Sequence, residues 1–370
     1  MAEIPYVRLN ADYGEIRADV IAAVDRVFGK GDFILGEAVE RFEQAAARPC
    51  GVAHVVALNS GTDALILGMK ALGIGPGDEV ITQPNSFVAS AAAIVHIGAT
   101  PVFADVLPDQ NIDPDQVAAA VTPRTKAIMA VHLTGRCAQM DRLRAIADRH
   151  RVLLIEDAAQ AFGSKYRGVD AGALGDLGCF SAHPLKNLNA AGDGGFATTN
   201  DAAVAERIRR LRNHGLVDRN TVSEWGYASR LDTLQAEVLL IRLQGLSSVI
   251  ERRRANAARY QGLLASAPVF CPPDRPEEFN TFHTFVIQVD RRDELRTHLL
   301  ENKIGAAIHY PVPLHLQPAA AHLGYKAGAF PVTERQAQRI LSLPIHQHLA
   351  EADIVRVAEC ISAFYGAARS

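Results

Sequence analysis

The chain has 370 residues, enough for about two ordinary domains and a large hydrophobic core. Apolar residues make up 48%, charged residues 21% and the formal net charge is −3, which excludes a disordered polyelectrolyte and argues against a general nucleic-acid binder. Five widely spaced cysteines without a CxxC pair predict free thiols in a reducing compartment. Neither a secretory signal nor a membrane span is recognisable, so we expect a cytoplasmic protein.

Short apolar runs alternate with stretches of helical spacing, a pattern typical of α/β layering. In the first part of the chain, strands are predicted at 52–58, 79–82, 127–131, 152–155 and 196–199, and helices at 62–72, 140–150 and 202–212.

The character of the sequence changes after a predicted helix at 234–246, which continues into an arginine-rich run. A segment rich in proline and charge follows, and then a strand at 284–289 and helices at 291–302 and 354–365. We therefore predict a large domain over residues 1–245, including an N-terminal arm, and a smaller α+β domain over residues 246–370. The segment up to Gly36 could pack on either one.

A turn of small residues follows the first predicted strand and opens the next predicted helix. It reads Asn59-Ser60-Gly61-Thr62-Asp63. Free backbone N–H groups and the positive end of the helix dipole suit such a turn to a phosphate. A plain helix N-cap is the alternative, because Ser and Thr are common there in any case. The turn contains neither GxxxxGK[ST] nor GxGxxG.

Two acids, Glu156 and Asp157, end the predicted strand at 152–155. Ligands of parallel sheets sit beyond the carboxyl ends of the strands, so one of these acids should lie near a pocket. Asp157 and Gln160 are three residues apart and could both face it. Capping of the following helix is the alternative.

Lys186 lies in a tight loop, between Pro184 and the turn Gly192-Asp193-Gly194-Gly195. An isolated lysine is usually a solvated surface charge. A partly desolvated lysine has a lowered pKa, and its neutral amine can attack a carbonyl.

Together, the turn at 60–62, the acid Asp157 and the lysine Lys186 are what pyridoxal 5′-phosphate (PLP) requires. The turn anchors the phosphate, the carboxylate keeps the pyridine nitrogen protonated, and the lysine holds the cofactor as a Schiff base and moves protons. Their order along the chain fits the large domain of α/β fold-type I (aspartate aminotransferase-like) enzymes, with a mainly parallel sheet.

Six motifs, taken in order, resemble those of the DegT/DnrJ/EryC1/StrS aminotransferases, which act on keto-sugars that are usually nucleotide-linked. The resemblance covers nearly the whole chain. The motifs are Gly31-Asp-Phe-Ile-Leu-Gly36, Asn59-Ser-Gly-Thr-Asp-Ala64, Glu156-Asp-Ala-Ala-Gln160, His183-Pro-Leu-Lys-Asn187 with Gly192-Asp-Gly-Gly195, Ser229-Arg-Leu-Asp232 and His309-Tyr-Pro-Val-Pro313.

The resemblance implies a role for each matching residue. Lys186 resembles the Schiff-base lysine and proton shuttle, and Asp157 the partner of the pyridine nitrogen. Further cofactor contacts are implied for Ser60, Gly61, Thr62 and Ser181 at the phosphate, for Gln160 at the 3-hydroxyl and for Phe87 over the ring. Phe87 could also be an ordinary core residue. The resemblance also implies that the sugar substrate is bound by His183, Asn187, His309 and Tyr310. The last two could instead form a structural turn.

The chain departs from the family pattern at two places. Relatives usually have Asn where this chain has Ala228, and that Asn reaches the phosphate across a dimer interface; Asn213 or Arg230 could substitute for it here. Asn189 and Ala190 stand where many relatives have Gly-Ala. The lysine itself is retained, whereas the dehydratase branch of the family has histidine, so dehydration is disfavoured.

The resemblance implies a PLP-dependent aminotransferase of amino-sugar and polysaccharide biosynthesis. It would pass an amino group from an amino acid, glutamate, to a nucleotide-linked keto-sugar by ping-pong chemistry, as a homodimer with shared active sites. We expect no metal, nucleic-acid or membrane partner. A keto-cyclitol or a free keto-sugar is an alternative acceptor. A non-enzymatic regulator with the same fold is a further alternative, disfavoured by the intact lysine, acid and turn.

Overall fold

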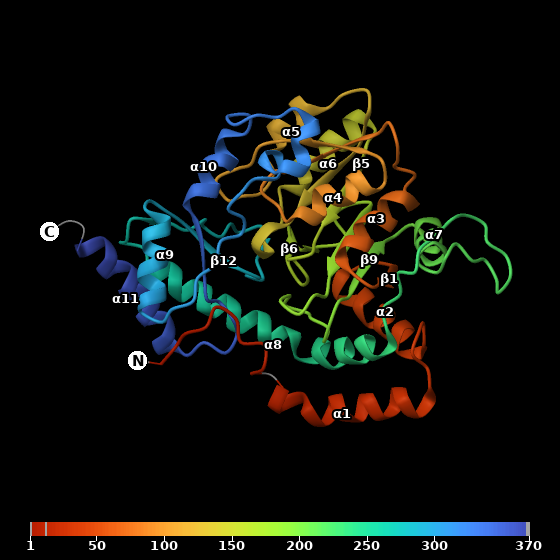
Figure 1. Ribbon diagram of the computed structural model, residues 1–370, viewed down its shortest axis with the longest axis horizontal. Helices are drawn as coiled ribbons and strands as arrows, with labels where there is room; N and C mark the ends of the chain where they lie inside the picture. Colours follow the sequence, from red (N-terminus) through yellow and green to blue (C-terminus); the bar gives the residue numbers. More distant parts are fainter. Residues whose placement is uncertain (1, 12, 368–370) are drawn as a thin grey trace.

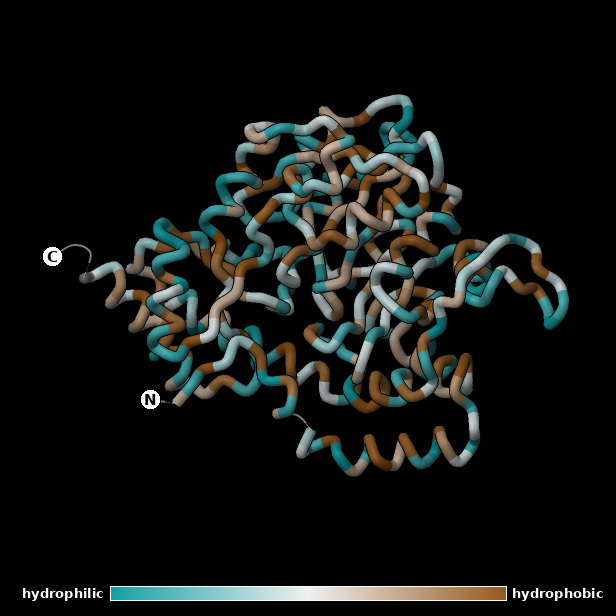
Figure 2. Tube along the Cα trace, viewed as in Figure 1, coloured by the Kyte–Doolittle hydropathy of each residue, from teal (hydrophilic) through white to brown (hydrophobic). Residues whose placement is uncertain are grey.

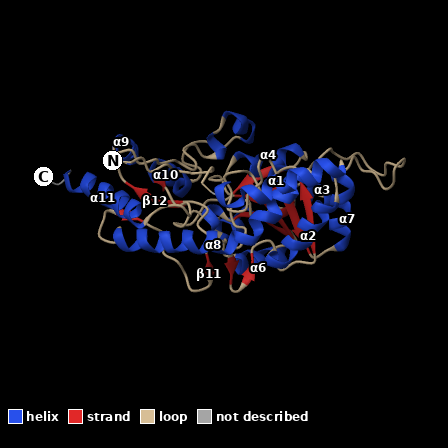
Figure 3. Cartoon of the chain, turned by 90° about the horizontal axis from the view of Figure 1, so that it is seen from below, coloured by secondary structure: helices blue, strands red, loops and turns tan. Residues whose placement is uncertain are grey.

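The computed structural model describes residues 2–11 and 13–367. A seven-stranded sheet in the order β1-β9-β8-β5-β4-β2-β3 forms its centre, with helices on both faces (Figures 1 and 3). Within this sheet β9 alone runs antiparallel to its neighbours, so the sheet is mainly parallel, as predicted. The strands are β1 (His54–Leu58), β2 (Glu79–Thr82), β3 (Thr100–Phe103), β4 (Thr125–Val131), β5 (Leu153–Asp157), β8 (Leu177–Ser181) and β9 (Gly195–Thr199).

A hydrophobic cluster fills each face of the sheet. Neighbouring residues of β4, Ile128 and Met129, belong to opposite clusters, because successive side chains leave a strand on opposite faces. One cluster is completed by α2 (Glu37–Cys50), α5 (Pro114–Ala120), α6 (Met140–His150) and α8 (Thr233–Leu263), the other by α3 (Gly61–Ala71), α4 (Val88–His96) and α7 (Ala202–Arg212).

A third cluster lies in the C-terminal part of the chain, around a three-stranded antiparallel sheet. The 31-residue helix α8 reaches both parts, with Leu246 in a cluster of the large sheet and Tyr260 in this one (Figure 1). The elements of this part are β10 (Val269–Phe270), β12 (Phe285–Val289), β13 (Ile340–Leu343), α9 (Arg292–Glu301), α10 (Pro331–Arg339) and α11 (Glu351–Ala367). A further small sheet pairs β6 (Lys165–Tyr166), β7 (Val169–Asp170) and β11 (Glu278–Phe279).

The N-terminal segment contacts both parts of the molecule. Ile4 bridges to Ile304 and belongs to the C-terminal cluster, whereas α1 (Tyr13–Lys30) lies along α8. Buried Glu237 of α8 pairs with Arg26 of α1 at 2.8 Å and with Arg41 of α2 at 3.3 Å. α1 lies at the edge of the molecule and carries hydrophobic residues along its length (Figure 2), some of which are exposed to solvent.

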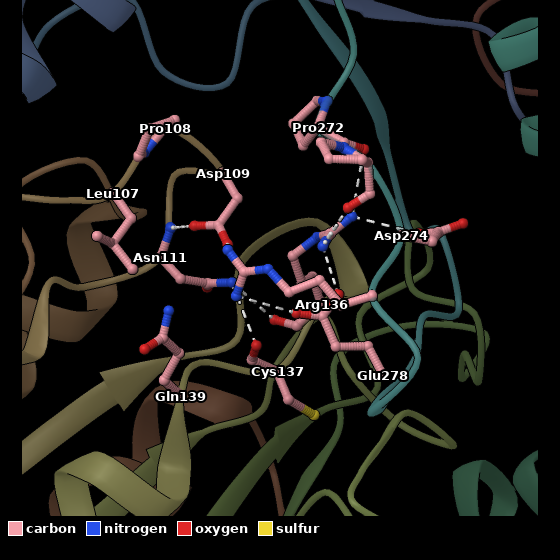
Figure 4. Close-up of polar contacts among 12 residues, drawn as sticks. Leu107, Pro108, Asp109, Asn111, Arg136, Cys137, Gln139, Pro272, Asp274 and Glu278 are labelled. Carbon is pink, nitrogen blue, oxygen red and sulfur yellow. Dashed lines mark hydrogen bonds and ion pairs between the residues drawn. The ribbon is translucent and has the colours of Figure 1, made fainter.

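A polar network ties the loop between β3 and α5 to residues 272–278 (Figure 4). Buried Arg136 donates to the carbonyl of Pro273 at 3.0 Å, pairs with Asp274 at 3.2 Å and contacts Glu278. Arg275 pairs with Asp109 at 2.9 Å.

None of the helices in the described ranges has the length and apolar character needed to cross a membrane. The five cysteines are free thiols.

Candidate active site

A cavity of about 370 Å³ opens at the carboxyl ends of β4, β5 and β8. Asn187 lies outside it, on a neighbouring groove, and its Nδ2 donates to the carbonyl of Thr281 at 3.2 Å. The other predicted site residues all line the cavity: Ser60, Gly61, Thr62, Phe87, Asp157, Gln160, Ser181, His183, Lys186, His309 and Tyr310.

The small-residue turn forms the start of α3 at one end of the cavity. Ser60 is the N-cap, and its hydroxyl accepts from the Asp63 N–H at 3.1 Å. The N–H groups of Gly61 and Thr62 have no partner within the helix, as in any first turn. A Cβ on Gly61 would lie 2.7 Å from the Ser181 Cβ, and one on Gly195 would lie 2.3 Å from the Ser60 carbonyl carbon. This close packing leaves a cradle of backbone donors that fits a phosphate.

Asp157 is the last residue of β5, and its carboxylate is buried at the floor of the cavity. It accepts from the Ser90 hydroxyl at 2.6 Å and from the Ala159 N–H at 3.3 Å. Ser90 in turn shares a hydrogen bond of 2.7 Å with the Ser86 hydroxyl. Burial raises the pKa of Asp157, although these hydrogen bonds and the charge of Lys186 lower it.

The neighbouring acid, Glu156, points to the other face of the sheet. It is fully buried and accepts from the N–H groups of Gly172 and Gly175 at 2.8 and 2.7 Å. His132 Nε2 lies 2.9 Å from it, and His132 Nδ1 accepts from the Ala138 N–H. Of the two acids, Asp157 is therefore the one that faces the cavity, whereas Glu156 satisfies backbone donors.

Lys186 enters the cavity from a loop that hydrogen bonds hold in place. Its own N–H donates to the carbonyl of His183 at 2.8 Å, and the Ala190 N–H closes the loop on the Ala182 carbonyl at 2.8 Å. Burial lowers the pKa of Lys186 to about 8, and the charge of Asp157 opposes this shift. A substantial fraction of the amine is therefore neutral near pH 7.5, as a nucleophile requires.

Aromatic rings form another wall of the cavity. Phe87 is 53% exposed, which rejects the alternative that it is a core residue, and its ring lies 5.7 Å from that of Tyr310. The Gln160 Oε1 accepts from the Thr134 N–H at 2.7 Å. His309 stacks on Tyr6 at 5.8 Å, and its Nδ1 lies 2.9 Å from the Ser342 hydroxyl.

Two residues at this site were not predicted from the sequence. Ser90 lies on α4, within an apolar stretch without a motif. His283 lines the cavity from the C-terminal part of the chain, and its Nδ1 has no hydrogen-bond partner within the described ranges. Burial, with the positive charges of Lys186 and Arg253, lowers the pKa of His283 well below its usual value. Neither residue has a local sequence signal, because each reaches the cavity only through the fold.

The site fits PLP. A backbone cradle, a buried carboxylate and a lysine of lowered pKa line one cavity, with an exposed aromatic ring for the cofactor face. Ala228, the first departure from the expected family pattern, forms an antiparallel bridge with Asn213, and Arg230 donates to the Asn213 Oδ1 at 3.1 Å.

Comparison with known proteins agrees with this geometry. The model of the DegT/DnrJ/EryC1/StrS aminotransferase family matches residues 14–362. The dTDP-3-amino-3,4,6-trideoxy-alpha-D-glucose transaminase of Streptomyces venezuelae is 44% identical over 97% of this chain and 95% of its own. The UDP-N-acetyl-3-dehydro-alpha-D-glucosamine 3-aminotransferase of Acidithiobacillus ferrooxidans is 42% identical over 97% of each chain.

Among solved structures, DesV of S. venezuelae in complex with a ketimine intermediate superposes with a TM-score of 0.96. It is 44% identical, over 98% of this chain and 99% of that one. Aminotransferases of this family depend on PLP. The chain therefore belongs to the DegT/DnrJ/EryC1/StrS family and is a PLP-dependent aminotransferase.

Proposed function

We propose that this enzyme transfers an amino group from L-glutamate to a keto-sugar that is linked to a nucleotide. The observation that carries the proposal is the placement of Lys186, with a pKa of about 8, in one cavity with Asp157 and the 60–62 cradle. The names of relatives over 40% identical, a dTDP-aminosugar transaminase and a UDP-aminosugar aminotransferase, support a nucleotide-linked acceptor.

Several residues of the cavity would hold the cofactor. Bound PLP supplies an electron sink for the charge that develops at the substrate carbon. The phosphate would be held by the N–H groups of Gly61 and Thr62, with the hydroxyls of Ser60 and Ser181 beside them. Asp157 would hold a proton at the pyridine nitrogen. Gln160 would contact the 3-hydroxyl, and Phe87 would cover the ring.

Lys186 Nζ would move the proton in both halves of a ping-pong cycle. The neutral amine would accept a proton from the substrate carbon, and the charged amine would donate one, so a pKa near the working pH serves both directions. On the substrate side, His183, His309 and Tyr310 would bind sugar hydroxyls, whereas Asn187 lies in the neighbouring groove. Burial lowers the pKa of His309, which makes its ring a neutral hydrogen-bonding partner.

We propose further that the enzyme is a homodimer with shared active sites, working in the cytoplasm. The loop 213–227 projects from the molecule beyond α7 (Figure 1). Exposed apolar side chains on α1 and on this loop support a second copy as the partner; they include Phe28, Val217 and Trp225, the last 90% exposed. The five free thiols suit a reducing compartment. Light scattering should give twice the chain mass, and a fully active monomer would contradict the dimer.

An absorbance titration tests the central proposal. Protein loaded with PLP should show a visible band that glutamate converts to the pyridoxamine form, and Lys186→Ala should abolish this conversion. A mutant with a near-normal rate would refute the role of Lys186. The loaded enzyme is then offered nucleotide-linked keto-sugars, free keto-sugars and keto-cyclitols. Preference for either of the last two would replace the proposed acceptor.

A further inference from the structure

The active-site cavity accepts two substrates of different character in turn. In a ping-pong cycle the amino acid donor carries a carboxylate beside its reacting carbon, whereas the reacting carbon of a keto-sugar has hydroxyl neighbours. Within the described residues no arginine lines the cavity, and the proposed function commits its one lysine, Lys186, to the cofactor. The carboxylate of the donor therefore needs another binding group.

Three histidines line the cavity, and two of them already have a partner. His183 is exposed, and its Nδ1 accepts from the Leu185 N–H at 3.3 Å. His309 Nδ1 lies 2.9 Å from the Ser342 hydroxyl. His283 is half-buried, and its Nδ1 is a buried atom without a hydrogen-bond partner in the part of the chain that the structure describes. Because a buried polar atom without a partner is unfavourable, this imidazole is the one of the three suited to a ligand.

Residues 280–284 carry His283 into the cavity, and we call this segment the strap. The four carbonyls at 280–283 all accept hydrogen bonds from side chains outside it: Arg254 at 2.7 Å, Asn187 at 3.2 Å and Arg253 at 3.1 and 3.2 Å. Gly135 packs so close to the strap that a Cβ there would lie 2.7 Å from the Thr281 Oγ1. These contacts fix the backbone, so the imidazole is positioned before a substrate arrives.

The groups whose charges act on His283 are cations and histidines from three parts of the chain: Lys186 and His183 in the loop at 182–190, Arg253 of α8, and His309. Burial and these positive charges lower the pKa of His283 well below its usual value, so its ring is neutral near pH 7. Three other titratable groups line the cavity: Asp157, Asp193 and Tyr310. A carboxylate placed against the imidazole would oppose the shift, because a neighbouring opposite charge favours the charged form.

We propose that His283 binds the α-carboxylate of the amino acid donor and takes up a proton from water as it does so, whereas the keto-sugar meets the same ring in its neutral form. The proton returns to water when the keto acid product leaves. This inference rests on the proposed function, because it takes glutamate as the donor. The α-carboxylate is one bond from the carbon whose proton Lys186 would remove, so a group in the same cavity as Lys186 can reach it.

Calorimetric binding of glutarate to the PLP-loaded enzyme tests the proposal, because glutarate has the carboxylates of the donor without its reactive amine. Measured near pH 7.5 in buffers of different ionisation enthalpy, the wild type should take up about one proton more per glutarate than His283→Gln does. Both proteins contain Lys186, so the difference counts the proton at residue 283. The variant should bind glutarate about tenfold more weakly, the loss expected for one charge-assisted hydrogen bond.

The pH dependence and a matched control complete the test. Between pH 7 and pH 8 the affinity of the wild type for glutarate should fall about tenfold more than that of His283→Gln, as linkage to one proton requires. His150→Gln removes an exposed histidine at the end of α6, outside the cavity, and should match the wild type in affinity and proton uptake.

Equal proton uptake by the wild type and His283→Gln would overturn the proposal. If the variant failed to hold PLP, a wild type that takes up no proton would overturn it equally. Loss of the uptake in His309→Gln and not in His283→Gln would assign the carboxylate to His309 instead. Conversion of the wild-type cofactor by glutamate is measured in parallel. Its failure would refute the proposed function, whereas normal conversion with equal proton uptake would refute the role of His283 alone.

Discussion

The orientation of the Asp157 carboxylate depends on a hydroxyl from another element, that of Ser90 on α4. We predict that Ser90→Ala lowers turnover about tenfold and weakens PLP binding, because a buried carboxylate that loses a hydrogen bond is destabilised by about 1.5–3 kcal/mol. Ser90→Thr retains the hydroxyl and should restore both. The dissociation constant of PLP, measured by fluorescence, separates this positioning role from a loss of folding. Unchanged affinity and turnover in the alanine variant would contradict it.

The pH dependence of cofactor capture should report the environment of Lys186. With a pKa lowered to about 8, the neutral fraction of the amine reaches one half near pH 8 and levels about one pH unit higher, whereas an ordinary lysine reaches one half only at about pH 10.4. The capture rate of PLP by cofactor-free enzyme should follow this curve in stopped-flow absorbance. Because the charge of Asp157 raises the pKa of Lys186, Asp157→Asn should move the plateau to lower pH. A profile still rising above pH 10 would exclude a buried amine.

The residues that could be predicted from the sequence are those whose chemistry is visible in a short motif. Lys186 and the 60–62 turn belong to this group. The strand pattern alone does not distinguish Glu156 from Asp157 as the cavity residue, because that depends on which face of β5 meets the cavity. His283 could not be predicted, because it lies far from the motifs in sequence and enters the cavity only through the fold. The catalytic and binding roles themselves stay predictions.

At the scale of elements, β9 supports the start of α3 directly. A Cβ on Gly195 would meet the Ser60 carbonyl carbon at 2.3 Å and the Gly61 nitrogen at 2.4 Å, so any side chain there displaces the cradle. We predict that Gly195→Ala destabilises the protein by about 1–3 kcal/mol and weakens PLP binding at least tenfold. Urea unfolding and PLP titration measure the two effects.

Gly262→Ala is the matched control for this substitution. Gly262 lies in α8, and nothing lies within 4 Å of a Cβ built on it. Alanine there should leave PLP binding unchanged and leave stability equal or raise it by up to about 1 kcal/mol. Equal PLP affinity in Gly195→Ala and Gly262→Ala would show that the cradle tolerates displacement.

Elements with a strong local pattern were predicted well, and those stabilised by distant contacts were not. The helices α6 and α7 begin and end as predicted. The helix predicted at 234–246 continues into the arginine-rich run, as expected, but it extends beyond that run to Leu263, which was not predicted. The strand β8 was missed, because Gly178 and Cys179 give it little β-propensity. The predicted domain boundary at 245 lies inside α8 and stays a prediction.

At the scale of the whole molecule, Arg136 joins segments that are far apart in the chain (Figure 4). Arg136→Met would leave the buried carboxylate of Glu278 with Arg275, at 3.5 Å, as its one remaining cation within the described residues, beside the Asn280 Nδ2 at 3.4 Å. We predict a loss of about 3 kcal/mol in the free energy of unfolding, measured in urea. Adding Glu278→Leu should recover part of it, since the uncompensated charge is then removed. A double variant less stable than Arg136→Met would contradict this explanation.

The packing of Gly195 against Ser60 also bears on how the enzyme is made. The cofactor cradle starts at residue 60, but β9, the strand that supports it, begins only at Gly195, which is 195 − 60 = 135 residues later in synthesis. β9 also lies between β1 and the rest of the sheet. A nascent chain that has not yet released β9 from the ribosome lacks this support and cannot form the finished cradle. The chain therefore cannot bind PLP until more than half of the polypeptide has been translated.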